Sequence, residues 1–153
     1  MPQLVKGGKY AFGWSTVSLD GEIVIPPEAV IEYKLTSDKV ILISGSKTSG
    51  GFSITGLQAL HASRLGVLLD KHPDLVNFEL PEGKVVENGS RLFCWVGQQC
   101  GKIKVPTQTL ERYGIKIGDR LLTIRGSHLG IGFAVKGPII KEANRHPELP
   151  SFE

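Results

Sequence analysis

Two stretches of the chain carry the same pattern eighty positions apart, Gly21-Glu22-Ile23-Val24-Ile25-Pro26 and Gly101-Lys102-Ile103-Lys104-Val105-Pro106. In each stretch, branched apolar residues recur at every second position and a proline ends the run. A period of two is typical of a half-buried strand, and proline ends a strand because it cannot donate a hydrogen bond to the ladder. We therefore expect one short strand in each stretch.

The similarity continues outward from these strands over residues 8–56 and 89–137, with one residue gained or lost in two loops. Tryptophan, proline, tyrosine and glycine residues agree in register, which indicates an internal duplication. The other matched segments are Phe12-Gly13-Trp14 with Phe93-Cys94-Trp95, Tyr33 with Tyr113, residues 38–46 with 119–127, and residues 52–56 with 133–137.

The rest of each half is typical of a short helix followed by a β-hairpin. Pro27 or Thr107 opens the helix, as these residue types do at a helix N-terminus, and Gly114 stands where a helix has just ended. In the second half we expect strands at 120–125 and 132–136, joined by a glycine-containing loop. One β–α–β–β unit cannot cover its own apolar face, so two units should interlock around a shared core.

Two further segments, 57–88 and 138–153, lie outside the duplicated units. We expect an amphipathic helix at 57–72, packed on the barrel, because apolar residues recur there at helical spacing. Residues 73–88 have the composition of an irregular connector. The tail from Pro138 should begin with a short helical turn and end extended or disordered, because two prolines lie near its end.

The combination of Gly-x-Ile-x-Val/Ile-Pro, a short helix, Gly-Ile-x-x-Gly-Asp and two strands resembles the AbrB/SpoVT/MazE superfamily of swapped-hairpin DNA-binding domains. The second half matches this pattern at 101–106 and 113–119. The first half matches at 21–26 but has Lys34-Leu35-Thr36-Ser37-Asp38 where the family has Gly-Ile and Gly-Asp. The resemblance covers roughly two thirds of the chain. It implies a mostly β, swapped-hairpin barrel formed as a pseudo-dimer within one chain.

Members of this family are usually dimers, and many are prokaryotic transcription regulators or the DNA-binding halves of antitoxins. The resemblance therefore implies a cytoplasmic DNA-binding protein that regulates transcription, with double-stranded DNA as its partner. Further self-association of pseudo-dimers would use residues 57–88, since the duplication already satisfies the internal interface.

Charge is distributed unequally between the two halves. Residues 89–137 hold eight cationic side chains and two carboxylates, a net charge of +6, whereas residues 8–56 hold four and five, a net charge of −1. Phosphate contact dominates DNA affinity, so a DNA-binding face needs clustered cations. Lys102 and Lys104 alternate with apolar residues and should point away from the core, and family members place an arginine at the Lys102 position. The candidate nucleic-acid contacts are Lys102, Lys104, Arg112, Lys116, Arg120 and Arg125.

Glu22 stands in the first half at the place that Lys102 holds in the second. A carboxylate repels phosphate, so a symmetric readout of duplex DNA by both halves is compromised. The cations of the second half would then be an ordinary solvated surface. The alternative hypothesis is a non-enzymatic ligand- or protein-binding module on the same fold that has lost DNA binding. The altered turn at 34–38 and the extra helix at 57–72 also favour it.

Two glycine-rich loops, 44–51 and 126–132, invite comparison with phosphate-binding loops. A phosphate loop needs a strand that leads into a helix, whereas both of these loops lie between strands. We therefore expect long hairpin turns. They could still line a ligand pocket at one end of the barrel, with Lys47 and His128 as the polar candidates.

Aromatic residues recur at equivalent places in both halves, at Phe12 and Trp14 and again at Phe93 and Trp95. Such residues can be stacking platforms for single-stranded nucleic acid. A symmetric core is the simpler explanation, because large aromatic side chains are mostly buried.

The remaining features favour no other class of protein. An apolar fraction of 41% and a charged fraction of 22% are ordinary for a globular protein. No stretch approaches the roughly 18 apolar residues that a membrane helix needs, so we expect no membrane association. Cys94 and Cys100 are poorly spaced for a zinc site and the four histidines are scattered, so we expect neither a metal nor a cofactor. No pairing of a nucleophile with a base predicts an enzyme.

Overall fold

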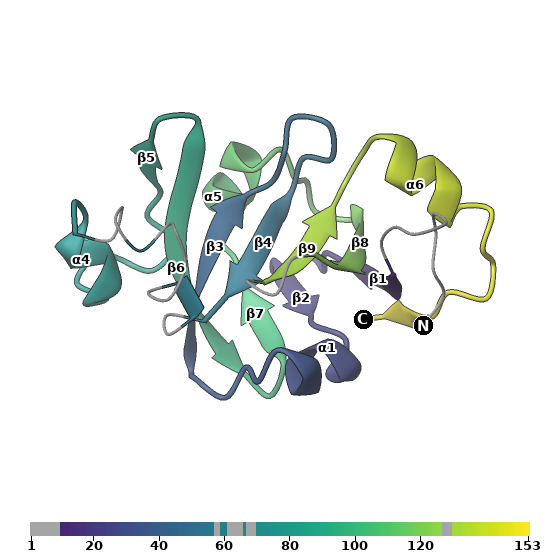
Figure 1. Cartoon of the computed structure of the whole chain (residues 1–153), viewed down its shortest axis with the longest axis horizontal. Helices are drawn as coiled ribbons and strands as arrows, with labels where there is room; N and C mark the ends of the chain where they lie inside the picture. The colour runs from purple at the N-terminus through teal and green to yellow at the C-terminus, as the bar shows by residue number, and fades with distance from the viewer. Residues whose placement is uncertain (1–9, 57–58, 61–65, 67–69, 127–129) are drawn as a thin grey trace.

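The strands of the described residues form one strongly curved sheet, which confirms the expected mostly β class (Figure 1). The computed structural model describes residues 10–56, 59–60, 66, 70–126 and 130–153. The strands are β1 (Ala11–Thr16), β2 (Glu22–Val24), β3 (Lys39–Ser44), β4 (Phe52–Thr55), β5 (Val86–Asn88), β6 (Arg91–Gln99), β7 (Lys102–Lys104), β8 (Arg120–Arg125), β9 (Ile131–Ala134) and β10 (Ser151–Phe152). Their order is β10-β1-β8-β9-β4-β3-β6-β7-β2, with β5 on β6, and the sheet forms a nearly closed barrel with few short helices.

Four antiparallel ladders join a strand of the first half to a strand of the second: β1 to β8, β2 to β7, β3 to β6 and β4 to β9. In the β2–β7 ladder the equivalent residues Ile23 and Ile103 lie opposite each other. In the β4–β9 ladder Phe52 and Phe133 do the same, and their rings stack with centroids 5.0 Å apart. Exchanging the two halves reproduces the same ladders, so both halves build the sheet together.

The sequence pattern did not predict β1 and β6, which precede the expected strands. All residues of β1 except the last are buried. Because both faces of the strand are covered, its sequence lacks the alternation of apolar and polar residues that marks a half-buried strand. Phe12 packs in the barrel core, and Trp14, on the other face of β1, packs in a second apolar cluster beside α6 (Pro138–Ala143). The expected β–α–β–β unit was therefore one strand short, and each half follows the order β–β–α–β–β.

The paired aromatic residues are part of the core, as expected. Phe12, Trp14 and Phe93 are at most 5% exposed. Trp95 is partly buried, packs edge-on against Phe78, and donates its indole N–H to the carbonyl of Leu80 at 2.8 Å. Buried rings of this kind cannot stack on nucleic-acid bases without unfolding the barrel.

The two short helices begin where the sequence predicts, with α1 at Pro27–Glu32 and α5 at Thr107–Arg112. Gly114 follows α5 with a φ of +75°, which a glycine adopts without steric penalty. The N–H of Ile115 then donates to the carbonyl of Leu110 at 2.9 Å and ends the helix. No helix among the described residues is long and apolar enough to cross a membrane.

The segment 73–88 is more ordered than expected, and its assignment as an irregular connector was wrong. It contains α4 (Pro73–Val76) and the edge strand β5. Proline suits the first turn of a helix, and Leu75 anchors α4 because it is buried in an apolar cluster with Ile41 and Ile43. Most of the helix expected at 57–72 lies outside the described residues.

The C-terminal tail begins with α6, as expected, and its extended end joins the sheet as β10. β10 pairs in parallel with β1, and the N–H of Trp14 donates to the carbonyl of Pro150 at 2.8 Å. A Cβ at Gly13 would lie 2.4 Å from the same carbonyl oxygen. The close approach of the tail therefore requires glycine here, whereas the equivalent position in the second half is Cys94.

Candidate nucleic-acid interface

The β2–β7 ladder brings Lys102 and Lys104 onto one exposed face of the barrel wall. Ile103 between them is 1% exposed and packs in the barrel core, so the strand alternates as the sequence predicts. The lysine side chains are 53% and 69% exposed. These two candidate contacts are therefore neighbours at the surface, on the strand pair that relates the two halves.

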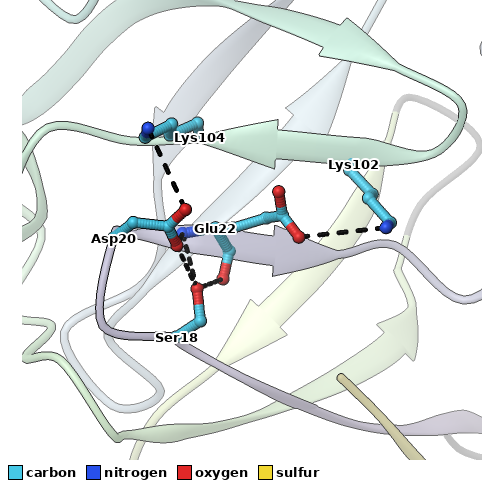
Figure 2. A network of polar contacts seen from close by, with 5 residues as sticks. All are labelled: Ser18, Asp20, Glu22, Lys102 and Lys104. Carbon is cyan, nitrogen blue, oxygen red and sulfur yellow. Dashed lines mark hydrogen bonds and ion pairs between the residues drawn. The ribbon is translucent and has the colours of Figure 1, made fainter.

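Each of these lysines faces a carboxylate of the first half (Figure 2). The ammonium of Lys102 lies 3.9 Å from Glu22, and that of Lys104 lies 3.9 Å from Asp20. The Ser18 hydroxyl and then the Glu22 backbone N–H donate hydrogen bonds to Asp20, and these bonds lower the pKa of its carboxyl group. Two lysines and two carboxylates therefore share this face, and their charges cancel.

The two arginines at the ends of α5 and β8 also have carboxylate partners. Arg112 contacts Glu87 of β5 at 2.5 Å. Arg125 binds Glu32 of α1 with two nitrogens, one of them at 2.8 Å, in the bidentate geometry that suits guanidinium and carboxylate. Both partners belong to segments that precede the second half in the chain.

Arg120 and Lys116 differ from the other four candidates. The guanidinium of Arg120 lies over the ring of Trp14, 4.3 Å from its centroid, as in a cation–π contact. The backbone N–H of Lys116 donates to the Asp119 carboxylate, and its side chain is exposed. Among the described residues, no carboxylate lies within 4.0 Å of the charged group of either residue.

The six candidates do not form one continuous face. Arg120 and Arg125 stand at opposite ends of β8, about 17 Å apart at the rise of a strand, and their odd spacing directs them to opposite faces of the sheet. Lys102 and Lys104 lie side by side on the exposed face of β7. The acidic partners were not evident from the sequence, although the opposite net charges of the two halves were a signal for contact between them.

A second polar feature is a groove of about 470 Å³ on the outer face of the barrel, which we call the outer groove. Ser53 and Thr55 of β4 and Gly132 of β9 line it, together with Phe52 and Phe133, which also belong to the barrel core. Residues of the β3–β4 loop border the groove near one end of the β4–β9 ladder, and Gly126 and Gly130 also line it, so the groove lies along this ladder.

Two polar residues, Lys47 and His128, were expected from the sequence to line a pocket formed by the loops. Lys47 lines the groove, whereas His128 lies outside the described residues. The groove also contains Arg91, which the sequence analysis did not assign to a pocket. Among the described residues, no group of three or more histidine, cysteine or acidic side chains is arranged to hold a metal ion.

No family model matches the chain, and neither a curated protein nor a solved structure matches it.

Proposed function

We propose that this chain is a swapped-hairpin pseudo-dimer of the AbrB/SpoVT/MazE type that works as a non-enzymatic ligand-binding module without general affinity for duplex DNA. The resemblance at residues 101–106 and 113–119 and the twofold register of the ladders support the fold. One observation carries the function: four of the six candidate cations have carboxylate partners within the chain.

These partners weaken the main driving force for DNA binding. Duplex affinity comes largely from cations that replace the counterions of the phosphates. The β2–β7 face has no excess of positive charge, because Asp20 and Glu22 match Lys102 and Lys104 in number. A phosphate that approaches this face would meet carboxylates as well as ammonium groups, and their repulsion would offset the attraction.

A transcription regulator that contacts duplex phosphates mainly through the second half is the second candidate. The geometry of the lysine pairs favours it. Both pairs are long, at 3.9 Å, and exposed, and pairs of this kind contribute little to stability. Lys102 and Lys104 could therefore exchange a carboxylate for a phosphate without a large loss of folding free energy.

Fluorescence anisotropy of a labelled mixed-sequence duplex, measured at about 50 and 200 mM salt, separates the two candidates because phosphate-driven binding falls steeply over this range. We expect no saturable binding by the wild-type protein at either concentration. Saturable binding that weakens strongly with salt, and that is lost in the triple variant Lys102→Gln, Lys104→Gln, Arg112→Gln, would instead establish the DNA-binding candidate.

A gain-of-function variant tests the physical reason. Removing the acidic partners by Asp20→Asn, Glu22→Gln and Glu32→Gln should create salt-sensitive duplex binding. The control variant gains the same net charge at exposed positions elsewhere, through Asp70→Asn, Glu79→Gln and Glu153→Gln, and should not bind. Equal binding by the two variants would show that net charge matters and that the local pairs do not.

A further inference from the structure

We infer that the outer groove binds a small organic anion, a molecule that carries a carboxylate or phosphate group on an apolar body. The inference rests on the proposed ligand-binding function and names the ligand class. The groove volume of about 470 Å³ lies within the roughly 300–1,000 Å³ that is usual for small-molecule sites. A duplex is too wide to enter a space of this size, so this surface and the β2–β7 face would serve different ligands.

The charge of the groove selects an anion. Lys47, in the β3–β4 loop, and Arg91, at the start of β6, both line it, and none of its lining residues is acidic. Among the described residues, no carboxylate lies within 4.0 Å of either charged group. These two cations therefore differ from Lys102, Lys104, Arg112 and Arg125, whose charges the chain itself neutralises.

Serine hydroxyls beside the cations provide hydrogen-bond donors. Ser44 accepts a hydrogen bond from the backbone N–H of Leu92 at 2.9 Å, and Ser46 accepts one from the N–H of Ser49 at 3.2 Å. A hydroxyl that accepts a bond still has its own O–H to donate. No acceptor for these two O–H groups lies among the described residues. The oxygens are thus held in place while their protons can serve a ligand.

The remaining lining explains why the ligand should also have an apolar part. Ile43 belongs to the apolar cluster beside α4, and Ile124 and Ala134 belong to the cluster beside α6. The groove therefore runs between two apolar patches, with its cations beside the β3–β4 loop. An inorganic ion would use only the polar part, whereas an organic anion would also bury apolar surface.

The inference can be tested with three small aromatic probes that share one ring: benzoate, phenyl phosphate and uncharged benzamide. Amide chemical shifts of the isotope-labelled full chain are followed by NMR at constant ionic strength, up to about 10 mM probe, since a fragment of this size binds at roughly millimolar concentration. We expect saturable shifts around the groove with at least one of the two anions and not with benzamide. Benzoate alone would identify a carboxylate ligand, and phenyl phosphate alone a phosphate ligand.

Substitutions in the groove test whether the anion binds there. Lys47→Gln with Arg91→Gln changes exposed side chains, and it should weaken anion binding by roughly tenfold or more, because hydrogen bonds to charged groups are lost. Lys71→Gln with Lys84→Gln removes the same charge from exposed positions outside the groove and should leave the affinity unchanged. Ser53→Leu, on the groove lining, should block binding without removing charge.

Three results would overturn the inference: no saturable shift with either anion, equal binding of benzamide, or equal loss in the groove variant and its charge-matched control. Each leaves the duplex measurement unaffected, so failure here is distinct from failure of the proposed function. Duplex binding by the wild-type protein would contradict the proposed function even if benzoate or phenyl phosphate bound to the groove.

Discussion

Glu22 and Lys102 occupy equivalent positions in the two halves, and they contact each other across the β2–β7 ladder (Figure 2). In a dimer of identical chains, equivalent positions next to a twofold axis carry the same residue and hence the same charge. A duplicated chain is free of this constraint. The single pair Glu22–Lys102 thus shows at the residue scale why the two halves could acquire opposite net charges.

The two cysteines should differ sharply in reactivity. Cys94 is fully buried, and burial raises the pKa of its thiol to about 11, against the smaller opposing effect of the hydrogen bond from the Tyr113 hydroxyl. Cys100 is exposed. Because the thiolate is the nucleophile, dithionitrobenzoate at pH 8 should titrate one thiol in the folded protein and two in denaturant.

The variant Cys100→Ser provides the control, and it should show no reaction until it is unfolded. Two thiols that react at similar rates in the folded wild-type protein would contradict the burial of Cys94. Such a result would also place in question the packing of β6 against β3, since Cys94 lies opposite Leu42 in that ladder.

At the scale of elements, β10 holds the C-terminal tail on the barrel, and a small cluster of charged groups links residues within the tail. His146 contacts Glu148 at 2.8 Å and Glu142 at 3.5 Å, and Glu142 also pairs with Arg145. The bond with Glu148, followed by that with Glu142, raises the pKa of His146 above its ordinary value of 6.5. The pKa of Glu148 is lowered from 4.5 by its own backbone N–H and by His146.

These shifts set a pH range for the local structure of the tail, from which β10 extends onto β1. A raised histidine pKa stabilises the folded form below pH 6.5, and this contribution is lost as the pH rises through the raised value. A lowered carboxyl pKa stabilises it above pH 4.5, and this contribution is lost as the pH falls through the lowered value. The docked tail should therefore be most stable between about pH 4.5 and 6.5.

Hydrogen exchange of the Trp14 amide, which donates to Pro150, measures docking of the tail directly. After correction for the intrinsic exchange rate, protection should decrease between about pH 6 and 8, where histidine loses its proton. The His146→Gln variant should show no such decrease. The Val105 amide, bonded to Gly21 away from the tail, serves as the internal control. An equal pH dependence of both amides would point to global unfolding instead.

At the scale of the whole molecule, each half depends on the other for its strand partners. β2 and β4 pair with β7 and β9, so neither half can complete these ladders alone. Two copies of the second half could in principle pair with each other. Their β7 strands would then place Lys102 and Lys104 opposite the same lysines without any carboxylate, which is destabilising.

Separated fragments should therefore be unfolded alone and fold on mixing. We expect residues 1–72 and 73–153 each to lack near-ultraviolet circular dichroism, and the equimolar mixture to recover the signal of the intact chain with a 1:1 mass. Addition of salt should help the second fragment to self-associate, because screening weakens the repulsion between lysines. A folded monomer of either fragment would contradict the shared sheet.

The sequence by itself determined several local elements of this protein, though not β1 and β6. Pro27 and Thr107 predicted where α1 and α5 begin, Gly114 predicted where α5 ends, and the strand at 120–125 was predicted to the residue. Signals of this kind come from neighbours within a few positions along the chain, so they can be read without knowing the fold. The duplication was also evident, because it is a property of the sequence itself.

Only the tertiary structure decided which distant residues meet. Arg125 finds Glu32 at a separation of 93 residues, β10 adds to β1, and Lys47 and Arg91 line one groove. No local pattern encodes these contacts, because they depend on how the strands of the two halves pair around the shared core. The charge count could show that the second half is basic, but whether its cations are free or neutralised depends on side chains that approach only after the barrel has formed.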